Sequence, residues 1–492
     1  MELIGNAAHY VEIKTFHSYC FDLLGRIGNL DDAKDVVERA ARMIGDGEVE
    51  PNRIAKTVLV IDEAQDMSAE EYALVRALMT ANEEMRVIAV GDDDQNIYEF
   101  RGSDSRYMVQ LLKESDGRLF EMTENYRSSQ HVVDFANAFS NGIRGRLKTM
   151  PLLSMIRQEG VVCIRHHVSH IMYQPLVEDL LAHRGQGSAC ILTQTNEEAV
   201  ILVALLRKHG LNGKLIQSMD GFRFWNMAEV RMFLKIIDRG TQTPVIPNNV
   251  WDEAKQKTYA MYADSASLAL LQRCVQSFEQ MNKIRYHTDF KEFLFESSVE
   301  DFCDISGADV VVSTIHKAKG REFDDVYMLV SNPQHVMDEV LRRYYVGATR
   351  AKSRLFIHTD STLFDRIPAD EHLVYRQQYG MPDEVVLQLT HRDVNLGFFK
   401  SRKREVLALR AGQPLRLEDN FLYGFHSDVP VAQLSQKMLA DLSLWAEKGY
   451  KPVSAVIRFV VAWRPKGAPK EEKEHAVLLV DLMLQNSPCR DI

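Results

Sequence analysis

Short runs of consecutive apolar residues set the strongest limit on the fold of this chain. Segments with helical spacing separate many of these runs. The runs that we take as candidate strands are Thr57–Ile61, Arg86–Val90, Val161–Arg165, Ala189–Thr193, Val310–Thr314, Val326–Val330 and Arg354–His358. Strands that are apolar along their whole length are typical of parallel sheets buried on both faces. Among the helical segments, Ser68–Met79 begins with a capping serine, and Asn196–His209 begins with a capping asparagine. The alternation predicts an α/β fold.

Composition narrows the class of protein. A chain of 492 residues is long enough for several domains. Its six cysteines are scattered without a C-x-x-C pair, which argues against a disulfide framework and the usual zinc sites and favours a reducing cytoplasm. No apolar run is long enough to cross a bilayer, and the first residues lack the features of a signal peptide, so we expect no membrane partner. The net charge is -10, so the charge of the whole chain does not favour nucleic-acid binding, and only local basic stretches could support it.

The first candidate site follows the run at Thr57–Ile61. That strand ends in two adjacent acids, Asp62 and Glu63. In phosphate-binding ATPases the first such acid holds Mg²⁺, and the second orients and deprotonates water. The alternative interpretation is a solvated acidic loop after a core strand.

A second loop, Gly91–Ser103, combines acids, an amide, aromatic rings and an arginine. Gln95 is suited to contact a phosphate or a water, and Tyr98 and Phe100 are suited to stack on bases. An ordinary turn with buried aromatics is the alternative. Further along, Arg127 and Arg350 are candidates for bidentate phosphate contacts, with a surface ion pair as the alternative for each.

The ordered set of these segments closely resembles motifs II to VI of superfamily 1 DNA helicases of the UvrD/Rep/PcrA-like group. Upstream, Lys14–Ser18 resembles motif Ib, and Phe222–Phe233 resembles a segment at a domain junction of that family. The whole chain also resembles the UvrD-like half of fusions with a RecQ-type helicase. In order, the segments that match motifs II to VI are Leu59–Asp66, Val87–Ser103, Leu119–Ser128, Val310–Phe323 and Leu341–Ala351.

The resemblance implies a role for each matched residue. Asp62 would hold the Mg²⁺ of ATP, and Glu63 would activate the attacking water. The γ-phosphate would meet Gln95, Arg127 and Arg350, while Tyr126 would stack on adenine, Glu322 would meet the ribose and Gly320 would belong to the same nucleotide site. A further set would line the path of single-stranded DNA, with Phe100 in place of the family's usual tryptophan: Thr15, Phe16, His17, Tyr98, Phe100, Arg101 and His316.

The resemblance also implies two RecA-like motor domains with parallel sheets. We expect a truncated first motor domain at 1–122, a second at 123–215 and 305–362, a reduced helical insertion at 216–304 and a small β-rich domain at 385–492. In the last, Thr390–Arg404 mixes basic residues with two phenylalanines. That mixture suits contact with a single strand or a strand end, and a solvated basic turn beside core phenylalanines is the alternative.

One family motif is missing from the sequence. No G-x-x-x-x-G-K-[ST] loop, the Walker A cradle for the phosphates of ATP, occurs in the chain. We therefore expect Met1 to be an internal methionine of a longer protein, or a partner chain to supply the missing half. The parent would be an ATP-dependent DNA helicase or translocase in DNA repair, binding ATP and single-stranded or partly duplex DNA between its motor domains. In this interpretation the chain is part of an ATP-hydrolysing helicase and is inactive when alone. The alternative is that the chain is a DNA-binding remnant or regulatory subunit that does not hydrolyse ATP.

Overall fold

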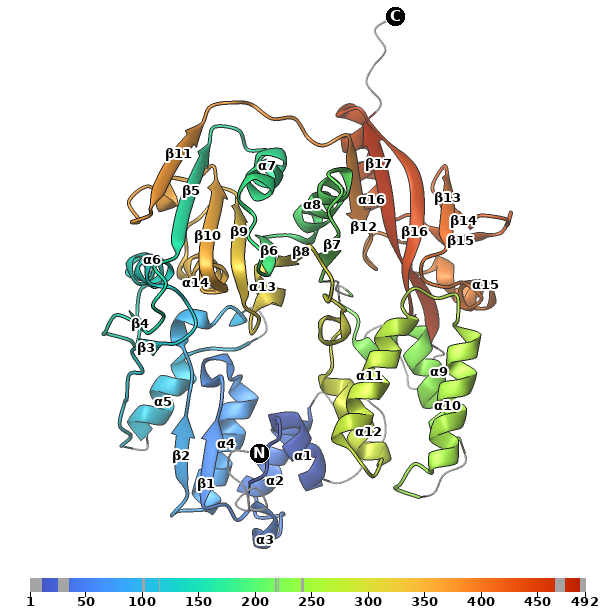
Figure 1. The fold of residues 1–492 in the computed structure, drawn as a ribbon. Coiled ribbons are helices and arrows are strands. Elements are labelled where there is room, and N and C mark those ends of the chain that lie inside the picture. The colour runs from blue at the N-terminus through green and yellow to red at the C-terminus, as the bar shows by residue number, and fades with distance from the viewer. Residues whose placement is uncertain are drawn as a thin grey trace, which may run out of the picture. The chain divides into compact units, whose positions relative to one another are not determined.

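The computed structural model describes residues 11–24, 35–99, 102–114, 116–216, 219, 221–239, 243–464 and 474–486 (Figure 1). The chain divides into two compact units. Unit 1 comprises Met1–Glu121, Gly145–Thr149 and Tyr286–Glu296, and unit 2 comprises Met122–Arg144, Met150–Arg285 and Ser297–Ile492. No helix in these described ranges combines the length and the apolar character needed to cross a membrane.

Unit 1 is built around a two-stranded parallel sheet. Strand β1 (Val58–Ile61) pairs with β2 (Arg86–Ala89), and Ile61 lies opposite Ala89. Helix α4 (Ala69–Ala81) connects the strands and begins with the predicted Ser68 cap, whose hydroxyl accepts a hydrogen bond from the Glu71 N–H. The remaining helices of the unit are α1 (Phe16–Leu24), α2 (Val36–Gly45), α3 (Pro51–Ile54), α5 (Arg106–Glu114) and α12 (His287–Glu296).

Only one face of this small sheet is covered by the described residues. Ile61, with Leu59 and Val87, packs into a core formed with α4 and α5. The opposite face is an exposed apolar surface, here called the open face, with exposed fractions of 47% for Val58, 60% for Val60, 51% for Ile88 and 43% for Val90. The prediction that these two strands are buried on both faces is therefore wrong for the described residues, because an apolar run does not specify what covers it.

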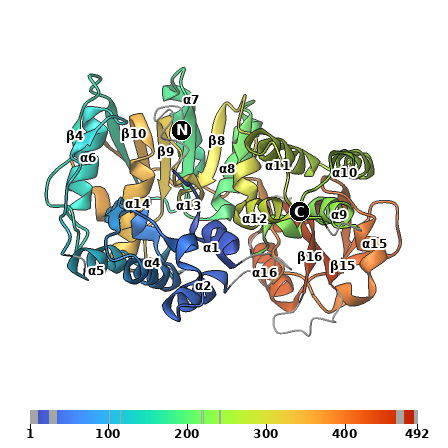
Figure 2. The ribbon, with the colours of Figure 1, turned by 90° about the horizontal axis from the view of Figure 1, so that it is seen from below.

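Unit 2 holds a seven-stranded, all-parallel sheet in the order β11-β5-β10-β9-β6-β8-β7. Helix α7 lies on one face of it and α14 on the other (Figure 2). Here the predicted strands are confirmed, and β6 and β8 are buried along their whole length. The strands are β5 (Val161–His167), β6 (Ala189–Thr193), β7 (Gly213–Leu215), β8 (Val310–Thr314), β9 (Phe323–Val330), β10 (Ala351–Thr359) and β11 (Glu371–Tyr375).

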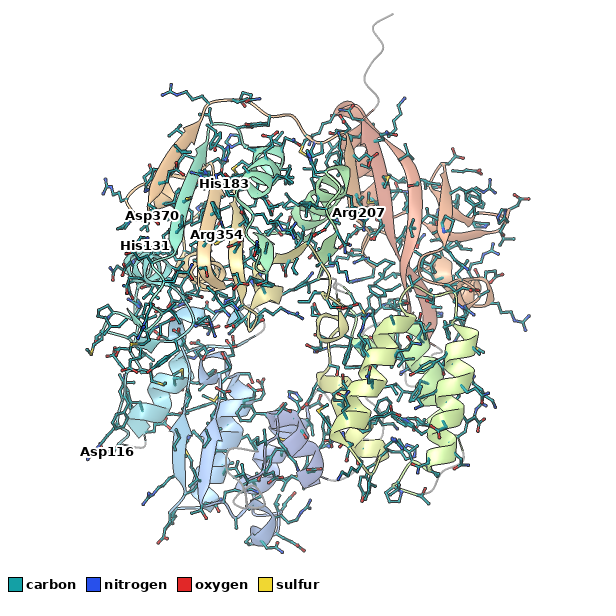
Figure 3. The ribbon with its side chains drawn as sticks, in the orientation of Figure 1. Asp116, His131, His183, Arg207, Arg354 and Asp370 are labelled. Carbon is teal, nitrogen blue, oxygen red and sulfur yellow. The ribbon has the colours of Figure 1, made fainter. Side chains whose placement is uncertain are left out.

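The helices beside that sheet are held by caps and ion pairs. Thr195, not the predicted Asn196, caps α8, because its hydroxyl accepts from the Glu198 N–H while the Glu198 carboxylate accepts from the Thr195 N–H. His131 on α6 pairs with Asp370 at 2.8 Å, and both are labelled in Figure 3. These helices are α6 (Gln130–Ser140), α7 (Tyr173–His183), α8 (Asn196–Lys208), α13 (Ile315–Ala318) and α14 (Asp338–Ala348).

The rest of unit 2 is a helical insertion and an antiparallel sheet. Helices α9 (Ala228–Ile237), α10 (Asn248–Met261) and α11 (Leu268–Met281) form the insertion, whereas α12 clusters with unit 1. The six-stranded sheet has the order β12-β17-β16-β13-β14-β15. Its elements are β12 (Glu384–Gln388), α15 (Lys403–Leu407), β13 (Pro414–Glu418), β14 (Phe421–Gly424), β15 (Pro430–Gln433), α16 (Gln436–Glu447), β16 (Tyr450–Trp463) and β17 (His475–Asn486).

Within the β-rich domain expected at 385–492, the stretch from α15 to β13 is not strand. Helix α15 extends to Leu407, and β13 begins at Pro414. Between them a turn is closed by the Arg410 N–H, which donates to the side-chain oxygen of Gln413 at 3.0 Å. A short separate parallel pair, β3 (Glu124–Asn125) with β4 (Leu153–Ser154), completes unit 2.

Candidate functional site

In unit 1 the parallel register brings two predicted motifs together at the carboxyl ends of β1 and β2. The Ala64 N–H donates to the Val90 carbonyl at 2.9 Å, and the Asp92 N–H donates to the side-chain oxygen of Gln65 at 3.0 Å. A Cβ on Gly91 would lie 2.3 Å from that same Gln65 oxygen, so only glycine fits there. The loop after β1 is therefore locked to the loop after β2, at the sheet edge where α/β proteins bind ligands.

Glu63 has a strained backbone at this edge. Its φ of 50° lies in the left-handed region, which costs free energy for a residue with a Cβ. Its carboxylate accepts a hydrogen bond from the Gln65 amide, so its side chain is held in one place. A strained, oriented and exposed carboxylate at a strand end fits the predicted water-activating role.

The residues beside Glu63 suit a divalent cation and a phosphate. Asp62 is exposed, and one of its carboxylate oxygens accepts from the Glu63 N–H at 3.0 Å. Its other oxygen has no hydrogen-bond partner in the described part of the chain, which leaves it available to Mg²⁺. The Gln95 amide donates to Asp92 at 2.8 Å, which holds Gln95 at the same edge.

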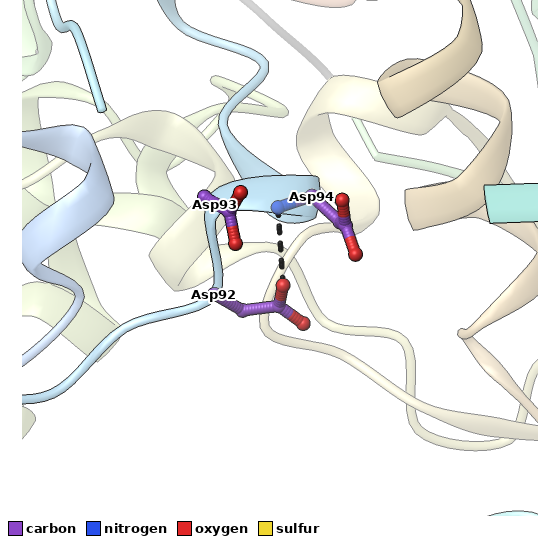
Figure 4. Close-up of side chains that lie close together, drawn as sticks. All are labelled: Asp92, Asp93 and Asp94. Carbon is purple, nitrogen blue, oxygen red and sulfur yellow. Dashed lines mark hydrogen bonds between the residues drawn. The ribbon is translucent and has the colours of Figure 1, made fainter. Parts of the chain in front are cut away.

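Three consecutive aspartates follow β2, and their side chains gather in a small cluster (Figure 4). Asp94 is fully buried, and Arg146 contacts its carboxylate through two nitrogens at 2.7–3.0 Å. Lys148 bridges Asp92 at 2.6 Å and Asp94 at 3.0 Å. Burial raises the pKa of Asp93 against the hydrogen bond from the Leu147 N–H, which lowers it. Arg146 and Lys148 thus pair with two of the three carboxylates of this cluster, those of Asp92 and Asp94.

The predicted DNA contacts of unit 1 lie on α1 and after β2. Thr15 caps α1, since its hydroxyl oxygen accepts from the Ser18 N–H at 3.1 Å, and the same hydroxyl donates to Glu296. Phe16 packs against the core of the unit, and the His17 ring lies 5.2 Å from that of Phe295. Tyr98 is half-buried. Phe100 and Arg101 lie outside the described residues.

In unit 2 the segments that resemble motifs IV and V meet. Tyr126 is 69% exposed, and its hydroxyl donates to Glu124, which raises the pKa of the phenol. The ring face is therefore open to stacking. Arg127 pairs with Glu322 at 2.9 Å, and both side chains are nearly half exposed. This places the predicted phosphate contact beside the predicted ribose contact.

The segment that resembles motif VI joins the same cluster through buried bonds. Ser128 donates to the Ala351 carbonyl at 2.7 Å, and the Phe323 N–H donates to the Arg350 carbonyl at 2.9 Å. The Arg350 side chain is only 1% exposed and donates to the Val346 carbonyl at 2.9 Å. Arg350 is therefore a packed residue in this conformation. Gly320 occupies a turn with φ of 81°, and His316 on α13 is half-buried.

Two family models match this chain. The UvrD/REP helicase N-terminal domain matches residues 28–116, and the UvrD-like helicase C-terminal domain matches residues 245–362. The chain belongs to the UvrD-like superfamily 1 helicases. The matches contain the segments after β1 and β2 in unit 1 and those at β8 and α14 in unit 2.

Individual relatives agree with this family. DNA helicase II of Salmonella typhimurium is 37% identical over 188 residues, which are 37% of this chain and 26% of that protein. The Gabija protein GajB of Bacillus cereus is 22% identical over 62% of this chain and 63% of its own length. The ATP-dependent DNA helicase PcrA of Staphylococcus epidermidis is 21% identical over 67% of this chain and 57% of its own length. The chain thus spans less than two thirds of these relatives.

Several residues that shape this candidate site carry no usable sequence signal. Arg146 and Lys148 pair with Asp92 and Asp94 from about 50 residues away, and a pair of basic residues in a loop is common. Gln65 was part of the matched motif, but its bonds to both strand-end loops depend on the register of β1 and β2. Lys352 lies 3.7 Å from Glu322 and adds a second cation beside Arg127.

Proposed function

We propose that this chain forms the nucleotide-facing and DNA-facing parts of an ATP-dependent DNA helicase or translocase acting in DNA repair. The observation that carries the proposal is the edge of unit 1, where Asp62, the strained Glu63 and Gln95 are held by bonds between two strand ends. A solvated acidic loop would not need a left-handed glutamate fixed by a buried glutamine.

Each side chain has a distinct task in this proposal. Asp62 supplies the carboxylate for Mg²⁺, and the bound ion would neutralise charge on the phosphates of ATP. Glu63 orients a water and accepts its proton, helped by the Gln65 amide that fixes the carboxylate. Gln95 contacts the γ-phosphate by hydrogen bonding. Tyr126 offers an open ring to adenine, and Arg127 offers a planar cation to phosphate.

Single-stranded DNA is the proposed polymer partner. Thr15, His17, Tyr98 and His316 provide hydroxyls and rings, the groups that suit unpaired bases and phosphates. Because the whole chain carries a net charge of -10, we expect this binding to depend on local contacts and to weaken steeply as salt rises.

The phosphate cradle is the part that these residues do not supply, because the sequence contains no G-x-x-x-x-G-K-[ST] loop. We propose that a polypeptide segment with this loop, either preceding this chain or in a separate chain, docks on the open face of unit 1. In support, Val60 and Ile88 are more than half exposed on adjacent parallel strands, and an apolar sheet face of this kind normally packs against another element.

A second candidate is favoured by the same missing loop. The chain alone would be a DNA-binding remnant or regulatory subunit that does not hydrolyse ATP. Both candidates predict DNA binding, and they differ in whether a complementing segment restores turnover.

The test is ATP hydrolysis by the purified chain, with and without single-stranded DNA. The measurement is then repeated after co-expression with a segment that carries the loop. We expect no turnover from the chain alone, and DNA-stimulated turnover from the complemented protein. Glu63→Gln should abolish that turnover at nearly unchanged size and fold, while the matched control Glu83→Gln, on an exposed loop of the same unit, should leave it intact.

Two results would contradict the proposal. DNA-stimulated turnover by the chain alone that disappears in Glu63→Gln would show that the phosphates are cradled by residues other than this loop. Absence of turnover after complementation, with DNA binding retained, would favour the non-hydrolysing subunit.

A further inference from the structure

Two histidines on neighbouring strands face one another at the edge of the parallel sheet in unit 2. Strand β11 ends that sheet and pairs with β5 (Figure 1). Nε2 of His166 on β5 lies 3.4 Å from Nδ1 of His372 on β11. The two ring planes are within 12° of parallel, and the ring centres lie 5.7 Å apart. Because the centres are much farther apart than the nitrogens, the rings meet edge to edge through these two nitrogens.

The other nitrogen of each ring has a partner of its own. The Nε2–H of His372 donates to the Ile367 carbonyl at 3.2 Å, and a carbonyl can only accept. Nδ1 of His166 lies 3.4 Å from a carboxylate oxygen of Asp365, which also accepts when it is ionised. A neutral imidazole carries one N–H hydrogen. In neutral rings with these partners, both hydrogens are therefore on the outer nitrogens, and the two facing nitrogens present lone pairs to each other.

A second histidine pair in the same sheet shows the arrangement that a hydrogen bond gives. Nε2 of His167 lies 3.0 Å from Nδ1 of His358, and the Nε2–H of His358 donates to Asp179 at 3.1 Å. Within the described residues Nδ1 of His167 has no hydrogen-bond partner, so the hydrogen of this ring can lie on Nε2 and be donated to His358. The pair at the sheet edge is longer, and it can share a hydrogen between neutral rings only by giving up an outer contact.

The separation of the pair at the sheet edge matches that of two ligands on one metal ion. Histidine nitrogens bind Zn²⁺ at about 2.0–2.1 Å in tetrahedral geometry, which places two of them about 3.3–3.4 Å apart. A carboxylate and a backbone carbonyl are also the usual outer partners of metal-binding histidines, because they fix the tautomer that leaves the ligating nitrogen bare. His372 and Asp365 are exposed, so an ion and water have access to the facing nitrogens.

We propose that His166 and His372 form a binding site for a divalent transition-metal ion, with water in the remaining coordination positions. Zn²⁺, Ni²⁺ and Cu²⁺ belong to the class of ions that imidazole nitrogens suit. Asp365 and the Ile367 carbonyl orient the two rings from outside. None of these residues is assigned to ATP or to the DNA path, so the site is independent of the proposed helicase function.

The strand that the ion would hold contributes to a buried polar cluster. Glu371 at the start of β11 pairs with Arg165, and the ring of Tyr375 at its end lies 4.8 Å from that of His167. Edge strands are paired on one side only, so local opening costs less there than in the middle of a sheet. An ion that bridges β11 to β5 would therefore protect these contacts from local opening.

The test is binding of Zn²⁺ to the full chain, measured by competition with a chromophoric chelator. We expect a site that His372→Gln removes and that Asp365→Asn weakens about tenfold, because loss of an outer partner typically costs about that much in metal affinity. The matched control is His335→Gln, at an exposed histidine of the same unit that has no hydrogen bond or ion pair within the described residues. This control should leave binding unchanged. Equal binding by wild type and His372→Gln, or an equal loss in His335→Gln, would overturn the proposal.

Two further measurements use the unaltered chain and do not depend on the folding of a variant. With Cu²⁺ in place of Zn²⁺, electron paramagnetic resonance should show nitrogen splitting from two imidazoles. Hydrogen exchange of peptides that contain residues 371–375 should slow when Zn²⁺ is added. A Cu²⁺ spectrum without imidazole nitrogens, or unchanged exchange of these peptides in saturating Zn²⁺, would refute the site and leave the proposed helicase function standing.

Discussion

The contact between α12 and α1 makes the stability of unit 1 depend on pH. Glu292 on α12 is 7% exposed, and its carboxylate accepts a hydrogen bond from the Ser18 hydroxyl at 3.0 Å. Burial raises the pKa of Glu292 to about 7, the nearby Asp289 and Glu296 act in the same direction, and Ser18 and Lys14 oppose them. The prediction concerns Glu292→Gln, which keeps the shape of the side chain and removes its titration.

The sign follows from proton binding. Between pH 4.5 and about 7 the folded state holds a proton on Glu292 that the unfolded state releases, so the free energy of unfolding falls as pH rises through this window. A pKa raised from 4.5 to about 7 corresponds to about 3 kcal/mol as an upper limit at pH 8, and to less than about 1 kcal/mol at pH 5. We therefore expect the stability of Glu292→Gln relative to wild type to increase by about 2 kcal/mol between pH 5 and pH 8.

The assay is urea unfolding of the full chain at the two pH values, with hydrogen exchange measured on peptides from α1 and α12. Exchange localises the effect, because unit 2 should not change. Glu83→Gln, at an exposed position of unit 1, is the control and should show no pH-dependent difference. A difference between Glu292→Gln and wild type that is the same at pH 5 and pH 8, or that reverses, would refute the reasoning.

Three smaller changes test other parts of the chain. Asp179→Asn should lower the free energy of unfolding, measured in urea, by about 3 kcal/mol. The buried carboxylate accepts from His358 at 3.1 Å and pairs with Arg165, whose charge would be left under-compensated. A decrease below about 1 kcal/mol would contradict this. Thr195→Ala should cost about 1 kcal/mol by the same measurement through loss of the α8 cap, and Thr195→Ser should restore it. In the complemented protein, Tyr126→Ala should weaken binding of a fluorescent ATP analogue about tenfold and Tyr126→Phe should not, since only the ring face is proposed to stack; equal losses would point to the hydroxyl instead.

The strands of unit 2 could be predicted from sequence, because continuous apolar runs record burial on both faces directly. For β6 and β8 the prediction is correct at every residue. The same pattern predicted β1 as a strand but did not predict that one of its faces is exposed. Burial of Val60 depends on a covering layer that the described residues do not provide. The buried Arg165 could not be predicted either, since its partners Asp179 and Glu371 come from α7 and β11 and meet only in the folded sheet.

The candidate site, too, could be predicted from the sequence only in part. Motif order and the position of acids after strands were enough to select Asp62, Glu63 and Gln95, because the carboxyl ends of parallel strands share one sheet edge. The bonds that orient them were not predictable. Arg146 reaches Asp94 from a distant loop, and no periodicity or spacing in the sequence links those two positions.

The two arginines predicted to contact the γ-phosphate differ in how readily they can do so. Arg350 is buried and bound to the carbonyl of Val346, so it must give up that bond before it can reach a phosphate. Arg127 is held by Glu322, an exposed carboxylate that a nucleotide can compensate, because ribose hydroxyls can donate to it. Under the proposed function, ribose hydroxyls that donate to Glu322 would compete with the Arg127 guanidinium for this carboxylate, which would favour movement of the guanidinium to the phosphates. Arg127 is therefore the arginine that this conformation makes available first.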